Sequence, residues 1–167
     1  MTFEPSRAFR VLNAHDVRYV VVGGLAGELL GAALATNAID VCYERSPDNM
    51  ARLADALRDL HAKLGVVGVE KDLPSILDGR TIAAGDSFGF TTDAGDLEIL
   101  GTPPGTGGFR DLDADATSYD LGDDLVVRVV SLDDLIRMKE ASGRPKDQAH
   151  LHVLAALKEM IAADRGE

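Results

Sequence analysis

The chain has 167 residues, of which 46% are hydrophobic, and we expect one globular domain with its own core. Its 17 basic and 28 acidic residues give a formal charge of −11, which argues against broad, sequence-independent binding to nucleic acid or to an anionic membrane. A small local basic patch is still compatible with that charge. The single cysteine, Cys42, cannot form an internal disulfide, and no apolar run is as long as a membrane span. We therefore expect a cytoplasmic protein without a membrane partner.

The first part of the chain alternates predicted helices and strands. Residues 6–16 have the apolar spacing of a short amphipathic helix. The next stretch, VRYVVVGG at 17–24, is apolar and β-branched, which predicts a strand buried on both faces and ended by two glycines. A short helix is expected over 25–34, and the alternation over 38–44 predicts a second strand.

The clearest helical pattern covers residues 46–65. Ser46 can cap its N-terminus and Pro47 suits its first turn. The inward stripe consists of Met50, Leu53, Leu57, Leu60 and Leu64. Residues 71–86 that follow are ambiguous between helix and strand.

A predicted β-hairpin comes next. Its two alternating runs are 87–92 and 95–101, and a short turn that contains glycine joins them. Residues 102–108 are rich in glycine and proline and predict a loop. We expect a short helix and a turn over 109–124, and then a strand over 125–130.

Two consecutive helices are predicted at the C-terminal end. Ser131 can begin a capping box for a helix over 131–142, Gly143 can end that helix, and Pro145 can start the last one. The order of elements predicts an α/β (α+β) fold, in which a small mixed sheet is covered by helices. No linker divides the sequence, so we expect residues 1–167 to form a single domain.

The glycine pair Gly23-Gly24 is the first candidate for a binding site. Two glycines between a buried strand and a helix allow a ligand to approach the backbone closely, and the helix start behind them offers free N–H groups to a phosphate. A tight turn without a ligand is the more common reason for such a pair. The pair alone therefore does not decide between the two interpretations.

Acidic residues on the predicted strands are the second candidate. Side chains two residues apart on a strand share a face, and two carboxylates in that position, with a third from a neighbouring strand, can hold Mg²⁺ ions. Asp40 is acidic, but position 38 is alanine, so one carboxylate of such a pair is missing. Asp96 and Glu98 share a face of the hairpin, and Glu98 lies deeper in its strand. The alternative is that Asp96 and Glu98 form only the solvated face of an edge hairpin.

The two C-terminal helices carry the third candidate. Lys139 lies on the apolar stripe of the first helix, and Asp147 opens the inward stripe of the second. A buried lysine is costly without an anion, so this pattern predicts a buried ion pair or a polar site. The alternative is a Lys139 side chain that extends to the edge of the core. Arg144 and Lys146, between the two helices, could meet phosphates or form an ordinary surface loop.

Three stretches together resemble the minimal nucleotidyltransferase fold of the DNA-polymerase-β-like superfamily. They are YVVVGGLAGELLGAALATNAIDV at 19–41, GDLEILG at 95–101 and LDDLIRMKEASGRPKDQAHL at 132–151. In more detail the chain is similar to the AbiEii and MenT class of nucleotidyltransferase toxins. The resemblance implies a Mg²⁺-dependent enzyme that transfers a nucleoside monophosphate from an NTP to a hydroxyl acceptor, with a tRNA 3′ end as one expected acceptor and an antitoxin as a possible partner.

The resemblance also implies a role for each site residue. Gly23 and Gly24 would form the triphosphate-binding turn, and Thr36 would contact phosphate. Asp40 and Glu98 would be the metal ligands. Lys139 and Asp147 would form a functional pair near the nucleotide. Arg144 and Lys146 would be two cations close to that pair.

Ala38 departs from the family pattern, which has an aspartate at this position. Loss of one metal ligand should weaken Mg²⁺ binding and transition-state stabilisation together. The alanine is either natural divergence or a substitution made because the active form harms its host, and the otherwise intact strand favours the second. The competing functional hypotheses are a non-catalytic module that binds a nucleotide or a partner, and nucleotidylation of a protein or a small molecule.

Overall fold

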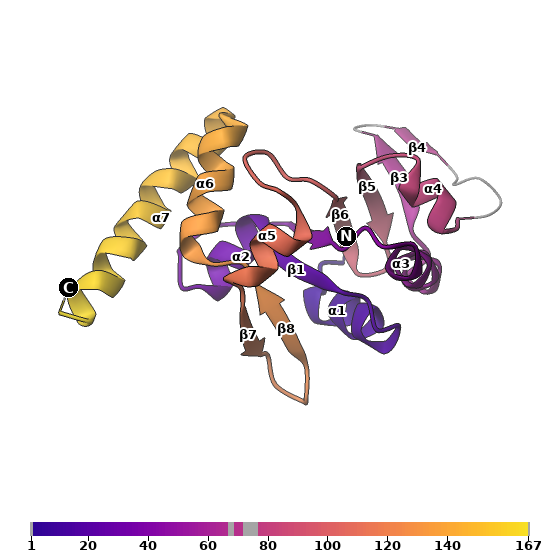
Figure 1. The fold of residues 1–167 in the computed structure, drawn as a ribbon, viewed down its shortest axis with the longest axis horizontal. Helices are drawn as coiled ribbons and strands as arrows, with labels where there is room; N and C mark the ends of the chain where they lie inside the picture. Colours follow the sequence, from indigo (N-terminus) through magenta and orange to yellow (C-terminus); the bar gives the residue numbers. More distant parts are fainter. Residues whose placement is uncertain (1, 67–68, 72–76, 167) are drawn as a thin grey trace.

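An eight-stranded mixed sheet forms the centre of the fold in the computed structural model, which describes residues 2–66, 69–71 and 77–166 (Figure 1). The strands are β1 Tyr19–Val22, β2 Ala38–Tyr43, β3 Lys63–Val66, β4 Val69–Lys71, β5 Ser87–Thr92, β6 Gly95–Leu100, β7 Thr117–Asp120 and β8 Val126–Val129. Their order across the sheet is β4-β3-β5-β6-β2-β1-β8-β7. This arrangement confirms the predicted α/β (α+β) class with a mixed sheet.

Strand β2 lies in the middle of the sheet and sets the register of the functional residues. It pairs antiparallel with β1, where Val22 lies opposite Asp40. On its other side it pairs parallel with β6, where Asp40 lies opposite Glu98 and Ala38 lies opposite Asp96. All four residues of β1 are buried, as its β-branched sequence predicts.

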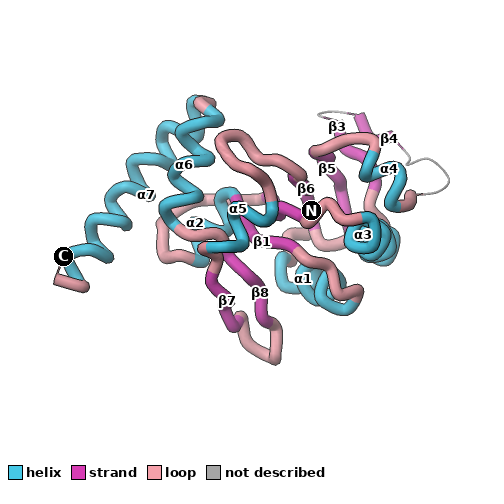
Figure 2. Tube along the Cα trace, in the orientation of Figure 1, coloured by secondary structure: helices cyan, strands magenta, loops and turns pink. Residues whose placement is uncertain are grey.

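Seven helices in the described residues surround the sheet. They are α1 Pro5–Ala14, α2 Gly23–Leu29, α3 Pro47–Asp59, α4 Gly79–Ala83, α5 Phe109–Ala114, α6 Leu132–Ser142 and α7 Pro145–Asp164. Helix α2 contacts β1, β2 and α6, while α6 contacts α7. Figures 1 and 2 show α6 and α7 together at one end of the molecule and α3 and α4 at the other.

The predicted ends of helix α6 are confirmed. The Ser131 hydroxyl accepts a hydrogen bond from the Asp134 amide at 3.1 Å, and Gly143 ends the helix in the left-handed conformation with φ 65°. These two caps fix where α6 starts and stops, and therefore which of its residues face inward.

Three boundary predictions were wrong. Helix α3 ends at Asp59 rather than continuing to residue 65, because His61 takes a left-handed φ of 51° and the chain then enters β3, which contains Leu64. Helix α2 ends at Leu29, five residues earlier than predicted. Strand β7 lies within 109–124, where only a helix and a turn were expected. Of the ambiguous stretch 71–86, residues 72–76 lie outside the described residues.

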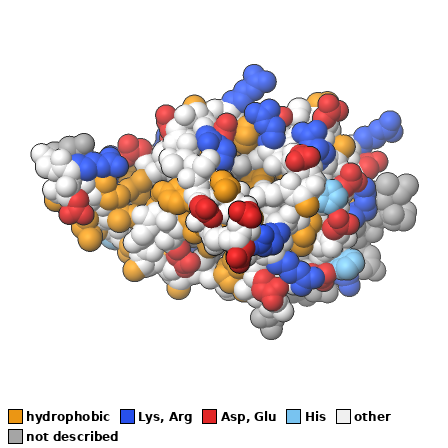
Figure 3. All heavy atoms as spheres, turned by 90° about the horizontal axis from the view of Figure 1, so that it is seen from below, with side chains coloured by type: hydrophobic (Ala, Val, Ile, Leu, Met, Phe, Trp, Pro, Cys, Tyr) orange, Lys and Arg blue, Asp and Glu red, His pale blue; other side chains and the backbone are white. Residues whose placement is uncertain are grey.

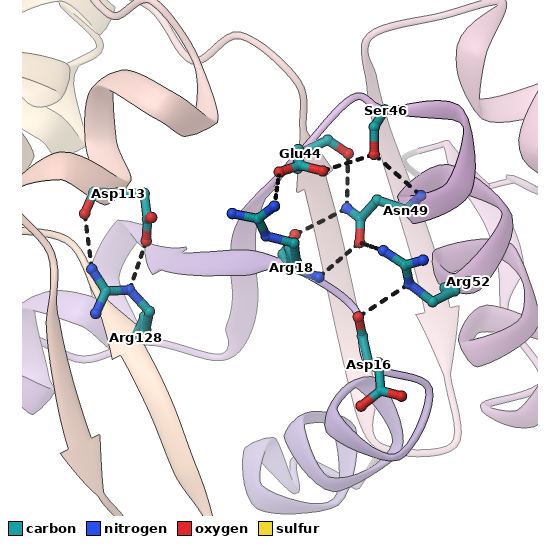
Figure 4. A network of polar contacts seen from close by, with 8 residues as sticks. All are labelled: Asp16, Arg18, Glu44, Ser46, Asn49, Arg52, Asp113 and Arg128. Carbon is teal, nitrogen blue, oxygen red and sulfur yellow. Dashed lines mark hydrogen bonds and ion pairs between the residues drawn. The ribbon is translucent and has the colours of Figure 1, made fainter.

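A buried asparagine ties α3 to the sheet (Figure 4). Asn49 is fully buried, and its side chain accepts a hydrogen bond from the Arg18 amide at 2.7 Å. It donates to the carbonyl oxygens of Arg18 at 3.0 Å and Glu44 at 2.8 Å. Because all of these partners are polar backbone atoms, the buried amide is satisfied and holds β1, β2 and α3 together.

None of the helices in the described part of the chain has the length and apolar character that a membrane span requires. On the face shown in Figure 3, basic and acidic side chains are interspersed rather than gathered into one basic surface.

Candidate active site

Two carboxylates lie side by side on adjacent strands. Asp40 of β2 and Glu98 of β6 are register partners in a parallel pair, so their Cα atoms are about 5 Å apart across the strands. Glu98 is exposed, whereas the Asp40 Oδ1 atom is buried and has no hydrogen-bond partner among the described residues. A buried carboxylate oxygen without a partner is unfavourable unless something binds it.

The electrostatics of Asp40 reflect this environment. Burial and the neighbouring Glu98 carboxylate raise the pKa of Asp40 to about 7, although the charges of Lys139 and Lys146 act in the opposite direction. Two carboxylates this close resist being ionised together. A bound cation would remove that repulsion.

The glycine pair makes room for these side chains. Gly23 has a φ of 71°, and a Cβ atom at this position would overlap with the Asp40 carboxylate. A Cβ atom at Gly24 would lie 3.1 Å from the Thr36 side chain. The Thr36 hydroxyl donates to the Ala38 carbonyl oxygen at 3.2 Å. Close packing against Asp40 and Thr36 therefore explains both glycines without a ligand.

Lys139 and Asp147 form the predicted buried ion pair. The Lys139 side chain is 9% exposed and that of Asp147 is 0% exposed, and the Lys139 Nζ atom lies 3.0 Å from an Asp147 carboxylate oxygen. The second oxygen accepts from the Ser142 hydroxyl at 2.6 Å and from Arg144 Nε at 2.9 Å. Burial alone would raise the pKa of Asp147, but the hydrogen bonds from Ser142, Lys139 and Arg144 hold it well below the usual range of an aspartate.

These bonds define the role that Asp147 can play. Three donors occupy its two oxygens, so the carboxylate has little capacity left for a substrate. Lys139 uses only one of its three N–H donors on Asp147. The geometry therefore makes Lys139 the group that can reach a ligand and makes Asp147 the residue that holds it in place.

A cavity of about 370 Å³ brings the two clusters together. The predicted site residues in its lining are Gly23, Asp40, Glu98, Lys139, Arg144 and Asp147. Three other predicted residues, Gly24, Thr36 and Lys146, lie outside the lining. Lys146 is exposed but close enough for its charge to lower the pKa of Asp40.

Several residues of this cavity were not predicted from the sequence. Ser142 went unnoticed, although a serine at a helix end, directly before a capping glycine, could have suggested a bond to the next helix. Met138 was not singled out within its predicted helix, and Pro103 and Pro104 were expected only as part of a loop. Nothing in the local pattern placed these three on the same cavity, because the contact depends on the tertiary fold.

The residues present fit one divalent cation better than a larger cluster. Mg²⁺ is commonly held by one or two carboxylates together with substrate phosphates and water, and Asp40 with Glu98 supplies two. Across residues 2–66, 69–71 and 77–166, no group of three or more Asp, Glu, His or Cys side chains is arranged to hold a metal. The third carboxylate of the family pattern is missing because position 38, which lies opposite Asp96 in the register, is an alanine.

Comparisons with known proteins agree with this geometry at the level of the fold. No protein-family model and no curated protein matches the sequence. The structure is similar to a protein from Thermotoga maritima assigned as a nucleotidyltransferase, with TM-score 0.56 and 15% identity over 87% of this chain and 86% of that one. It is also similar to the lincosamide antibiotic adenylyltransferase LnuA, solved with lincomycin bound, with TM-score 0.60 and 14% identity over 94% of this chain and 99% of that one. The chain therefore has the fold of these nucleotidyltransferases.

Proposed function

We propose that the protein is a nucleotidyltransferase that transfers a nucleoside monophosphate from an NTP to a hydroxyl group. The observation that carries this proposal is a cavity whose lining contains the Asp40 and Glu98 carboxylates together with the buried Lys139. Phosphoryl transfer requires positioned cations and charge stabilisation, and this cavity offers a place for both within a nucleotidyltransferase fold.

Each residue has a distinct part in this proposal. Asp40 and Glu98 would hold Mg²⁺, which when bound supplies charge neutralisation and orientation for the phosphates. Lys139 would contact the triphosphate through its free N–H donors, while Asp147 keeps its ammonium in position. The polar groups proposed to contact the phosphates further out are Gly23, Gly24, Thr36, Arg144 and Lys146.

The proposed reaction replaces a phosphoanhydride bond of the NTP by a phosphoester bond to the acceptor. The acceptor oxygen attacks the α-phosphorus of the NTP and forms a new P–O bond, while the bond to the leaving pyrophosphate breaks. The acceptor hydroxyl loses its proton to a carboxylate or to water. No step requires an oxidant or a second substrate beyond the NTP and the acceptor.

Two kinds of acceptor remain in the proposal. The resemblance to the AbiEii and MenT toxins favours a tRNA 3′ end, in which case a cognate antitoxin would neutralise the protein in the cytoplasm. The net charge of −11 and the fold shared with a lincosamide adenylyltransferase favour a small hydroxyl compound or a protein side chain. Label transfer from an α-labelled NTP to purified tRNA, or to a panel of hydroxyl-bearing antibiotics, separates the alternatives.

A non-catalytic nucleotide- or partner-binding module is the second candidate function. Ala38 is the observation that favours it, because only two carboxylates are available where the family has three. In that case the chain would bind an NTP without transferring it.

Restoring the missing carboxylate tests the proposal. We expect Ala38→Asp to bind NTPs more tightly in the presence of Mg²⁺ than the unmodified chain, measured by calorimetric titration of ATP, GTP, CTP and UTP. Ala38→Asn is the matched control, because it has the same size without the charge. Label transfer by Ala38→Asp, but not by the unmodified chain or Ala38→Asn, would support an enzyme. NTP binding without label transfer by any of the three proteins would support the non-catalytic module. Absence of NTP binding by all three proteins would refute the nucleotidyltransferase and the nucleotide-binding module, and would leave only a module that binds another partner.

A further inference from the structure

The loop between β6 and α5, residues 101–108, lies beside α6 (Figure 2). Pro103 and Pro104 both line the cavity. Gly105 comes so close to α6 that an added Cβ atom would lie 2.7 Å from the Ala141 Cβ atom, and its φ is 77°. The loop therefore follows a defined path over the site.

Polar contacts hold this loop at both ends. The Asp86 carboxylate accepts from the Thr102 amide at 3.0 Å and from the Thr102 hydroxyl at 3.2 Å. At the other end the Asp111 carboxylate accepts from the Gly107 amide at 2.9 Å and pairs with Arg137 of α6 at 2.9 Å. The ion pair links the loop to the same helix that carries Lys139.

The composition GTPPGTGG suggests a phosphate-binding loop, but its amides are already in use. Pro103 and Pro104 have no N–H group, and within the described structure Gly105 alone of the other six has an amide without an acceptor. The remaining five amides donate to Asp86, Pro103, Thr106 and Asp111. A phosphate cradle needs several free N–H groups on one side, so this loop does not provide one.

The loop instead supplies an apolar surface. The lining of the cavity combines apolar residues, among them Leu100, Met138 and the two prolines, with charged residues, among them Lys139, Asp40 and Glu98. An NTP has the same combination, with a flat base at one end and a highly charged triphosphate at the other. Proline rings and a methionine side chain are suitable partners for a flat ring.

We propose that residues 101–108 form the nucleobase-binding wall of the site, with the base packed on Pro103 and Pro104 and the phosphates directed towards Lys139. This inference rests on the proposed function, since it assigns the two ends of the NTP to two sides of the same cavity. It makes the loop a determinant of base binding and leaves it without a part in phosphate binding.

Displacing the loop tests this assignment. Gly105→Ala adds a methyl group at a left-handed position against Ala141, so the loop must move away from α6. We expect this variant to raise the Kd of the tightest-binding NTP about tenfold and to leave the Kd of tripolyphosphate unchanged, both measured by calorimetry with Mg²⁺. Gly122→Ala is the matched control, because it has a φ of 95° with nothing within 4 Å and lies in the turn between β7 and β8.

A second variant covers the case in which Gly105→Ala does not fold. Pro103→Ala combined with Pro104→Ala removes the ring surfaces directly and should also weaken NTP binding relative to tripolyphosphate. Equal losses for both ligands, or no loss for either, would overturn the assignment of the loop to the base. Absence of NTP binding by the unmodified chain would instead be a failure of the proposed function, so the two failures are distinguishable.

Discussion

Replacing Asp147 by asparagine is expected to destabilise the fold by about 3 kcal/mol, because it leaves the Lys139 ammonium buried without an anion. The magnitude follows from the environment of the pair. The side chain of Asp147 is 0% exposed and that of Lys139 is 9% exposed, so water can compensate little for the lost charge. Removal of one partner of a buried pair typically costs about 3–5 kcal/mol, and the asparagine oxygen, which can still accept hydrogen bonds, places this variant at the lower end.

The assay is urea unfolding followed by far-UV circular dichroism, with thermal melts in parallel. A loss of about 3 kcal/mol should lower the melting temperature by roughly 6–12 °C in a chain of this size. The control is Lys139→Met combined with Asp147→Leu, which removes both charges and should recover most of the lost stability. A cost below about 1 kcal/mol for Asp147→Asn would refute the reasoning, because it would mean that the pair is not desolvated.

The pH dependence gives an independent check of the same pair. The pKa of Asp147 is lower in the folded protein than in the unfolded chain, so the unfolded state binds its proton first as the pH falls. The stabilisation from Asp147 should be complete above about pH 5 and decrease as the pH falls below about 4, the usual aspartate value. Asp147→Asn should lack this pH-dependent stabilisation. The difference in the free energy of unfolding between the unmodified protein and Asp147→Asn should therefore become smaller in acid.

Three further predictions concern single positions. Asp40→Asn should stabilise the fold by about 1–3 kcal/mol at pH 8, because burial and Glu98 raise the pKa of Asp40 to about 7 and its ionised form opposes folding. This gain should vanish below about pH 4 in urea unfolding. Gly23→Ala should lower the free energy of unfolding by about 3 kcal/mol or more. Gly143 is also left-handed, but an added Cβ atom would meet nothing within 4 Å, so Gly143→Ala should lower it by only about 1 kcal/mol in the same assay. Ser131→Ala should cost about 1 kcal/mol by loss of the helix cap, measured by thermal melting.

Each of these predictions has a result that contradicts it. A destabilised Asp40→Asn variant at pH 8 would show that the Asp40 charge is compensated in the folded protein. Equal costs for Gly23→Ala and Gly143→Ala would mean that the contact with Asp40 is not tight. An unchanged melting temperature for Ser131→Ala would indicate that other donors or water replace the cap.

The sequence predicted the Lys139–Asp147 pair because helical periodicity converts directly into geometry. The two residues lie on inward stripes of consecutive helices, and a polar residue on such a stripe needs a partner. The partners of Asp147 at the helix junction were harder to foresee. The bond from Ser142 depends on the path of the chain between α6 and α7, through the left-handed Gly143, which no periodicity encodes.

The strands show where local patterns stop being informative. Asp40 and Glu98 were expected to share a site, but their exact register was not predictable, because it depends on the parallel pairing of β2 with β6. Leu64 fitted the apolar stripe of α3 yet lies in β3, since a left-handed residue three positions earlier ends the helical run. The apolar wall at Pro103 and Pro104 required the tertiary fold as well.

Asp40, rather than Ala38, carries the physical argument that this site binds a charged ligand. Its carboxylate has a buried oxygen without a partner in the described chain, and it lies beside Glu98, so its ionised form is unfavourable in the fold. Gly23 adds to this cost, because it gives up a side chain and takes a left-handed conformation to accommodate the same carboxylate. An apolar residue at position 40 would relieve the cost of the charge, but not the constraint on Gly23, because an added Cβ atom there would also lie 2.9 Å from the Cβ atom of residue 40. Local costs that meet at one point, opposite a buried lysine, are typical of binding and catalytic sites and are not expected of a surface that serves the fold alone.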